Sequence, residues 1–179
     1  ESFQKDFDVI SSKAKDAELK RKKLEIKAQQ DVTSKVNAFS KIYDELMKNT
    51  LPDCRSAKIR LDNYLPSIND GLYRETSALV SIRLMYFITL MHLSLSDKSV
   101  TFPRFLLIDT PETAGIELDY LQNCIGQLEG LQEYGVDFQV IISTGLNKYP
   151  DSLKDNRVLF MPDRKQKEHM LLKEKKFSY

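Results

Sequence analysis

The sequence predicts an α/β lobe in which parallel buried strands are flanked by helices, with one long helix on its N-terminal side. Two short apolar runs, at 105–109 and 138–143, end in polar residues, as buried strands of parallel sheets do. The segment between them has a helical pattern, and a strand–helix–strand unit predicts parallel strands with a right-handed crossover. Neither Gly nor Pro occurs from Glu1 to Thr50, which predicts the long helix. We therefore expect a coiled-coil arm at 1–49 and a head lobe at 50–179.

The composition is that of a folded protein, and its overall charge does not indicate a particular class of binding partner. Of its 179 residues, 41 % are hydrophobic and 30 % charged, and the formal net charge is +1. Basic residues gather at 13–27 and 164–176, and we interpret both segments as solvated helix faces rather than nucleic-acid patches. Cys54 and Cys124 have neither CxxC spacing nor a histidine at metal spacing, which predicts reduced thiols in a cytosolic protein. The charged N-terminus, ESFQKDFD, predicts that there is no signal peptide.

The arm carries an apolar seam at coiled-coil spacing. Its members recur at steps of three and four residues: Phe3, Phe7, Ile10, Ala14, Ala17, Leu24, Ala28, Val32, Val36, Phe39, Tyr43 and Leu46. Arg21 interrupts the seam, and the steps from 28 to 32 to 36 shift its register. A helix of about 45 residues, roughly 70 Å long, cannot bury such a stripe alone. We expect a partner helix from another chain or from a part of the protein outside this sequence; packing against its own head is the alternative.

Two segments of the head precede the predicted sheet. Loose alternation over 57–68 predicts an edge strand or hairpin, followed by a turn at 69–71. The segment 75–95 is the most apolar of the chain and predicts a central helix capped by Thr76 or Ser77, where backbone amides favour an anion. From 77 to 95 it is long enough to span a bilayer, but Arg83 near its middle would cost about 2.5–3.5 kcal/mol there. We therefore expect this helix to pack against the sheet, and we do not expect it to span a membrane.

The predicted sheet begins within 102–119, FPRFLLIDTPETAGIELD. The run from Phe105 to Ile108 leads directly into Asp109, which predicts a strand buried on both faces with a carboxylate at its C-terminal edge. Ligands of open α/β sheets bind at that edge. A polar turn and a helix at 117–132 follow, then a second strand at 138–143 and a third at 157–161. A final helix is expected in the tail from 162 onward.

Taken in order, the parts are a coiled-coil arm, a short strand, an apolar helix opening with Ser or Thr, a strand ending in Asp, a turn, a helix and a strand ending in a polar pair. This order resembles the C-terminal lobe of an ABC-type ATPase head of the SMC-like family of DNA-repair and chromosome-structure proteins, over nearly the whole chain. The resemblance implies the C-terminal half of a P-loop NTPase fold. Asp109 then matches the Walker B aspartate that holds Mg²⁺-bound water, and Pro111 the proline of the family's DEP sequence. Thr113 to Glu117, with Gly115, match the D-loop, and 139–143 match the strand before the switch.

The chain departs from the family pattern at several positions. Thr110 stands where the family has its catalytic Glu and cannot act as a base, so Glu112, two positions on, is the candidate catalytic group at this turn. The LSGGE signature is replaced by a segment with four candidate ATP contacts: Arg74, Glu75, Thr76 and Ser77. Thr144 takes the place of the switch histidine, as a weaker γ-phosphate contact. Because no GxxxxGK[ST] loop occurs, the resemblance predicts a separate N-terminal lobe that supplies it.

The function implied by the resemblance is ATP hydrolysis by a completed head. ATP and Mg²⁺ would be held between two heads, in a homodimer whose arms move on DNA, in the cytoplasm or at the nucleoid. Repair, chromosome organisation and defence against foreign DNA all fit. The alternative is a non-hydrolysing head that dimerises as a scaffold, because Thr110 and Thr144 replace the family's hydrolysis residues. A GTPase is disfavoured, because Glu112 and Pro150 stand where the DxxG and NKxD motifs need Gly and Asp.

Overall fold

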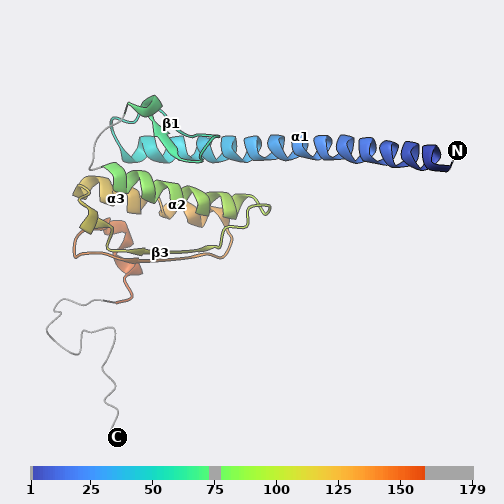
Figure 1. Cartoon of the computed structure of the whole chain (residues 1–179). Coiled ribbons are helices and arrows are strands. Elements are labelled where there is room, and N and C mark those ends of the chain that lie inside the picture. The colour runs from blue at the N-terminus through green and yellow to red at the C-terminus, as the bar shows by residue number, and fades with distance from the viewer. Residues whose placement is uncertain (1, 73–77, 160–179) are drawn as a thin grey trace, which may run out of the picture.

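The structure, a computed structural model, describes residues 2–72 and 78–159. Its helices and strands are α1 (Ser2–Thr50), β1 (Ala57–Ile59), β2 (Pro66–Ile68), α2 (Leu79–Ser96), β3 (Phe105–Asp109), α3 (Leu118–Gly126) and β4 (Gln139–Ser143). Short 3-10 turns are η1 (Asn69–Gly71), η3 (Pro111–Ala114), η4 (Glu129–Tyr134) and η5 (Asp151–Asn156). Figure 1 shows three layers, with the end of α1 above α2 and α3, and the β3–β4 pair below them. The predicted mixed α/β class is confirmed.

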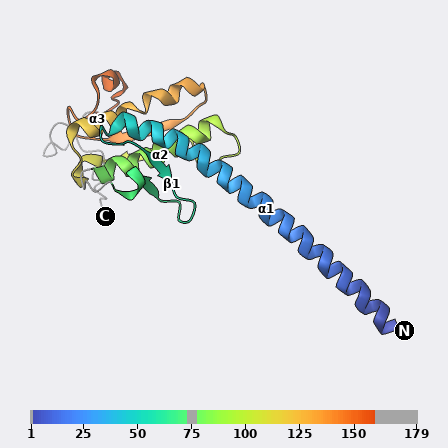
Figure 2. The same ribbon diagram turned by 90° about the horizontal axis from the view of Figure 1, so that it is seen from above.

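The long helix α1 has two different environments. It runs unbroken for 49 residues, as its lack of breakers predicted. Near its C-terminal end Phe39, Tyr43 and Met47 enter the core of the head, and the buried Tyr43 hydroxyl donates to the Ile82 carbonyl at 3.1 Å. Toward the N-terminus the seam is uncovered, with Phe3 92 % and Leu24 67 % exposed. Figures 1 and 2 show this part projecting away from the head, so one helix both packs on its own head and presents an unpartnered arm.

A hairpin fixes the head to the base of the arm. β1 and β2 pair antiparallel, from Ala57 opposite Ile68 to Ile59 opposite Pro66, which confirms the hairpin prediction. Side chains of α1 accept hydrogen bonds from β1: Asp44 from the Ala57 amide at 2.7 Å, and Ser40 from the Ile59 amide at 3.0 Å.

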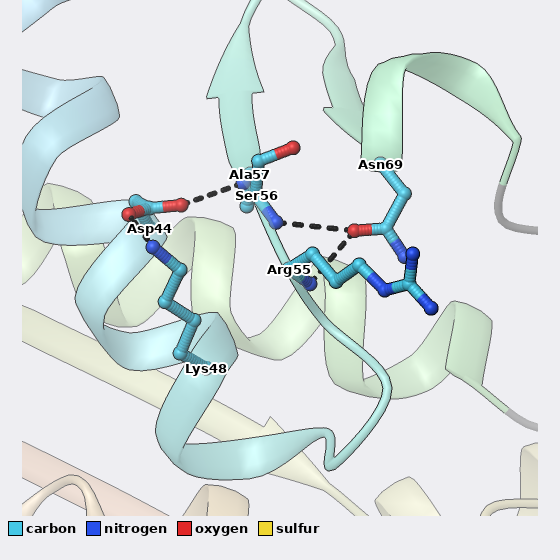
Figure 3. A network of polar contacts seen from close by, with 6 residues as sticks. All are labelled: Asp44, Lys48, Arg55, Ser56, Ala57 and Asn69. Atoms are coloured by element: carbon cyan, nitrogen blue, oxygen red, sulfur yellow. Dashed lines mark hydrogen bonds and ion pairs between the residues drawn. The ribbon is translucent and has the colours of Figure 1, made fainter.

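The residues around the hairpin are held in the same way. The Asn69 side-chain oxygen accepts from the backbone amides of Arg55 and Ser56, at 2.8 and 3.1 Å, and Lys48 pairs with Asp44 at 2.6 Å (Figure 3). These contacts satisfy backbone groups that would otherwise lack partners at the strand edge.

The central helix α2 lies between α1, α3 and the sheet. One described helix, this one, is long and apolar enough to cross a membrane, and 56 % of that stretch is buried inside the molecule. Its buried residues include Met85, Ile88 and Met91, and contacts on several sides account for its nearly uniform apolar character. The predicted capping residues Thr76 and Ser77 lie outside the described residues.

The parallel pair β3–β4 has one covered and one open face. The strands pair in register from Phe105 opposite Gln139 to Asp109 opposite Ser143. The even-numbered side chains face the helices, and Leu106 is 8 % exposed. On the other face Leu107 is 62 % exposed, and Phe105 and Ile141 are exposed as well. The prediction of burial on both faces is therefore wrong for the described chain, because side chains alternate along a strand and no layer lies on the second face.

Two further predictions fail at element ends. The helix expected over 117–132 ends at Gly126 and continues as the 3-10 turn η4, since glycines at 126 and 130 weaken a helix. The third strand expected at 157–161 is not formed over 157–159, where Val158 is 98 % exposed and none of the described strands pairs with it. Positions 160–161 and the helix predicted in the tail lie outside the described residues.

Candidate functional site at the C-terminal edge of the parallel strands

The last residues of the two parallel strands bring Asp109 and Ser143 together. Equal strand lengths and an in-register pairing place them opposite each other, both on the open face of the sheet. The Ser143 hydroxyl donates a short hydrogen bond to an Asp109 carboxylate oxygen. Both side chains are exposed, so a carboxylate and a hydroxyl meet at the edge where ligands of α/β sheets bind.

The turn after β3 adopts a left-handed backbone at a residue that is not glycine. Thr110 has φ 41° and ψ 58°, a conformation that costs a β-branched residue energy. Its amide donates to the Ser143 carbonyl at 2.9 Å, and its own carbonyl accepts from the Thr113 hydroxyl at 2.9 Å. The turn closes at Gly115, which has φ 83°. Thr110 therefore shapes this turn with its backbone.

Glu112 reaches from this turn to the turn after β4. One of its carboxylate oxygens accepts from the Gly145 amide at 2.6 Å, and the other accepts from the Thr144 hydroxyl at 3.1 Å. A Cβ built on Gly145 would lie 3.2 Å from the Glu112 oxygen and 3.1 Å from the Lys148 side chain, so a larger residue would crowd this contact. The two turns are thus joined through one partly buried carboxylate.

Of the site residues predicted from the sequence, six lie at the end of β3 and in the two turns: Asp109, Thr110, Glu112, Thr113, Gly115 and Thr144. Hydrogen bonds link Asp109, Glu112 and Thr144 into the contacts described above, whereas Thr113 and Gly115 are exposed and form hydrogen bonds within the first turn only. Arg74, Glu75, Thr76 and Ser77 lie outside the described residues. Their predicted contact with ATP stays a prediction.

Ser143 and Gly145 belong to the site but were not predicted. Their roles depend on which residue of β4 stands opposite Asp109, and that register is a property of the paired strands. The signal available in the sequence was that both apolar runs end in a polar residue, Asp109 in one and Ser143 in the other.

A divalent cation would find one carboxylate here. Among the described residues, no group of three or more His, Cys, Asp or Glu side chains could hold a metal ion. Asp109, with the Ser143 hydroxyl beside it, offers hard oxygen atoms at an exposed edge. Mg²⁺ is commonly bound by one or two carboxylates together with water and phosphate oxygens, so Asp109 fits a share in such a site and cannot form it alone.

Two other features of the head, a surface hollow and a buried cysteine, do not indicate a catalytic site. A hollow of about 720 Å³ between α3 and η5 is lined by amides and charges of both signs, such as Gln122, Asn147 and Lys154. The Cys124 thiol is fully buried, and desolvation raises its pKa to about 12, so it stays protonated and unreactive. The strand edge remains the place where polar groups of different elements converge.

No family model, curated protein or solved structure matches this chain.

Proposed function

We propose that this chain is the C-terminal lobe of an SMC-like, ABC-type ATPase head that a separate lobe carrying the P-loop completes. The observation that carries the proposal is the β3–β4 pair, which ends in Asp109 and leaves one apolar face open. Parallel sheets occur almost only with both faces covered, and a two-stranded sheet is marginal by itself. A P-loop lobe would extend the sheet with further strands and would cover its open face with a second layer.

The residues at the strand edge suit defined tasks in such a head. Asp109 would contribute its carboxylate to Mg²⁺, and the turn formed by Thr110, Thr113 and Gly115 would face the nucleotide. Glu112 is the candidate group for orienting the attacking water, and Thr144 would donate to the γ-phosphate. The segment 74–77 would contact ATP held on a second, identical head. When bound, ATP supplies the phosphoryl group whose transfer to water drives opening of the heads.

The arm supports the mechanical side of the proposal. Its seam is exposed over the N-terminal part of α1, which suits a coiled-coil partner. Its base is held to the β1–β2 hairpin by Asp44 and Ser40, so movement of the head would be transmitted to the arm. We also propose that the arms move on DNA and that the protein works in the cytoplasm or at the nucleoid. It would not span a membrane.

The direct test is Mg²⁺-dependent ATP hydrolysis by the completed head, with Asp109→Asn compared with wild type. Removing the carboxylate that faces the metal should lower turnover on the order of a hundred-fold or more. Asp119→Asn, an exposed carboxylate in the first turn of α3, is the matched control and should leave turnover unchanged. Measurable turnover that is equal in wild type and Asp109→Asn would refute the assignment of Asp109.

A second variant separates binding from hydrolysis. Glu112→Gln should abolish hydrolysis while ATP-driven dimerisation, followed by analytical ultracentrifugation, persists. Unchanged turnover in this variant would remove Glu112 as the catalytic group.

A non-hydrolysing scaffold head is the second candidate. It is favoured by Thr110, which follows Asp109 and cannot act as a general base. It is also favoured by Glu112, whose carboxylate already accepts hydrogen bonds from Gly145 and Thr144. In that case the wild-type completed head would dimerise with ATP and show no turnover above the Asp109→Asn variant.

A further inference from the structure

The turn after β4 presents two hydrogen-bond donors, and both are filled by a carboxylate of the same chain. The Gly145 amide and the Thr144 hydroxyl each donate to a different oxygen of Glu112, at 2.6 and 3.1 Å. Neighbouring donors that bind the two oxygens of one carboxylate are also suited to two oxygens of a phosphate group. The absence of a Cβ at Gly145 allows this close approach, because a Cβ there would lie 3.2 Å from the Glu112 oxygen.

We propose that Thr144 and Gly145 form a phosphate-binding pair that the Glu112 carboxylate occupies until phosphate replaces it, so that Glu112 acts as an internal, inhibitory substitute for the anion. A phosphate group can reach these donors only after Glu112 leaves them. Departure of Glu112 also frees its carboxylate from the turn after β4. Only the identity of the anion rests on the proposed ATPase. In that enzyme, phosphate bound at these donors would keep Glu112 displaced from them and available to orient the attacking water.

Electrostatics make the exchange unfavourable while the carboxylate is in place. A phosphate at this edge would meet the charges of both Glu112 and Asp109, and the Asp109 carboxylate already has the Ser143 hydroxyl as a donor. The chain holds the Glu112 carboxylate beside these donors, so it competes with phosphate from solution at a high effective concentration. Removing the carboxylate should therefore improve phosphate binding, the opposite of what loss of a ligand-binding residue does.

The experiment follows the backbone amide resonance of Gly145 by NMR while inorganic phosphate is added to the 179-residue chain. Glu112→Ala should show a saturable shift at Gly145 with a dissociation constant roughly ten-fold or more below that of wild type. Glu112→Gln, which keeps an oxygen acceptor but no charge, should lie between the two. Asp119→Ala, which removes an exposed carboxylate seven positions further along the chain, is the control and should behave as wild type.

Equal Gly145 responses in wild type and Glu112→Ala, including no response in either, would overturn the proposal. Unchanged far-UV circular dichroism shows that a variant is folded, and Glu112→Gln provides the comparison if the alanine variant is not. Because this measurement needs neither ATP nor a second lobe, its failure leaves the ATPase test standing. An inactive completed head would likewise leave a positive phosphate result intact.

Discussion

At the scale of single residues, His92 is a titratable group that the fold holds in its neutral form. The side chain is 8 % exposed on α2, and its Nδ1 lies 3.1 Å from the Tyr134 hydroxyl. The two rings also pack edge to face, with centroids 5.6 Å apart. Burial lowers the pKa of His92 below its ordinary value, because the charged imidazolium would lose its hydration.

This gives a pH dependence of stability with a definite sign. The unfolded chain takes up a proton on His92 near pH 6.5, while the folded chain does so only at lower pH. Between these values the unfolded state binds more protons, so the contribution of His92 to the free energy of unfolding should be constant above about pH 7 and fall as the pH drops below about 6.5. Urea unfolding at pH 7.5 and 5.5 measures this. In His92→Gln the difference should shrink, and an undiminished difference would show that another group is responsible.

The site shows what could be predicted from the sequence at this scale. Asp109 was predicted at the C-terminal edge of the sheet because it ends an apolar run, whereas Thr144 was predicted only as the counterpart of the switch histidine in the family that the chain resembles. The partnership of Ser143 with Asp109 and of Gly145 with Glu112 could not be predicted. Those contacts depend on strand register and on the left-handed backbone of Thr110, neither of which the local pattern determines.

At the scale of elements, the base of the arm and the hairpin form one unit. The Ala57 amide of β1 donates to Asp44 of α1, whose other oxygen binds Lys48. Burial alone would raise the pKa of Asp44, but the Lys48 ammonium and the Ala57 amide together hold it below its ordinary value. Long patterns such as the breaker-free α1 determine an element by themselves, so its extent was predicted. The prediction of a third strand was wrong because a strand forms only beside a pairing strand, and a short apolar run does not show whether one is present.

Removing the Asp44 carboxylate should loosen this unit. Asp44→Ala leaves the Ala57 amide without its acceptor, so the free energy of unfolding should fall by about 1–3 kcal/mol in a urea titration. Glu45→Ala, at the neighbouring exposed position, is the control and should change stability by about 0.5 kcal/mol at most. Equal effects of the two substitutions would show that the hairpin is held in place without Asp44.

At the scale of the whole molecule, the described chain covers one face of its sheet with helices and leaves the other face exposed. Helices cover Leu106 and Ile108, while Phe105, Leu107 and Ile141 remain exposed on the opposite face. Both strands of the pair also have a free edge within the described residues. The exposed seam of α1 adds a second unpartnered surface, at the far end of the molecule from the sheet (Figure 1). In the larger head that we propose, both surfaces would be covered.

Hydrogen exchange at the sheet edges tests this account most directly. Since Thr110 donates to the Ser143 carbonyl and Gln139 to the Arg104 carbonyl, the alternating pattern of a parallel pair points other amides outward. These are the amides of Leu107 and Asp109 on β3, and of Val140 and Ile142 on β4.

In the 179-residue chain alone these amides should exchange rapidly. In the head completed by the P-loop lobe, the amides of at least one edge should slow on the order of a hundred-fold, because a new strand pairs with them. Equally rapid exchange at both edges in the completed head would contradict the account, since the sheet would then end at these two strands.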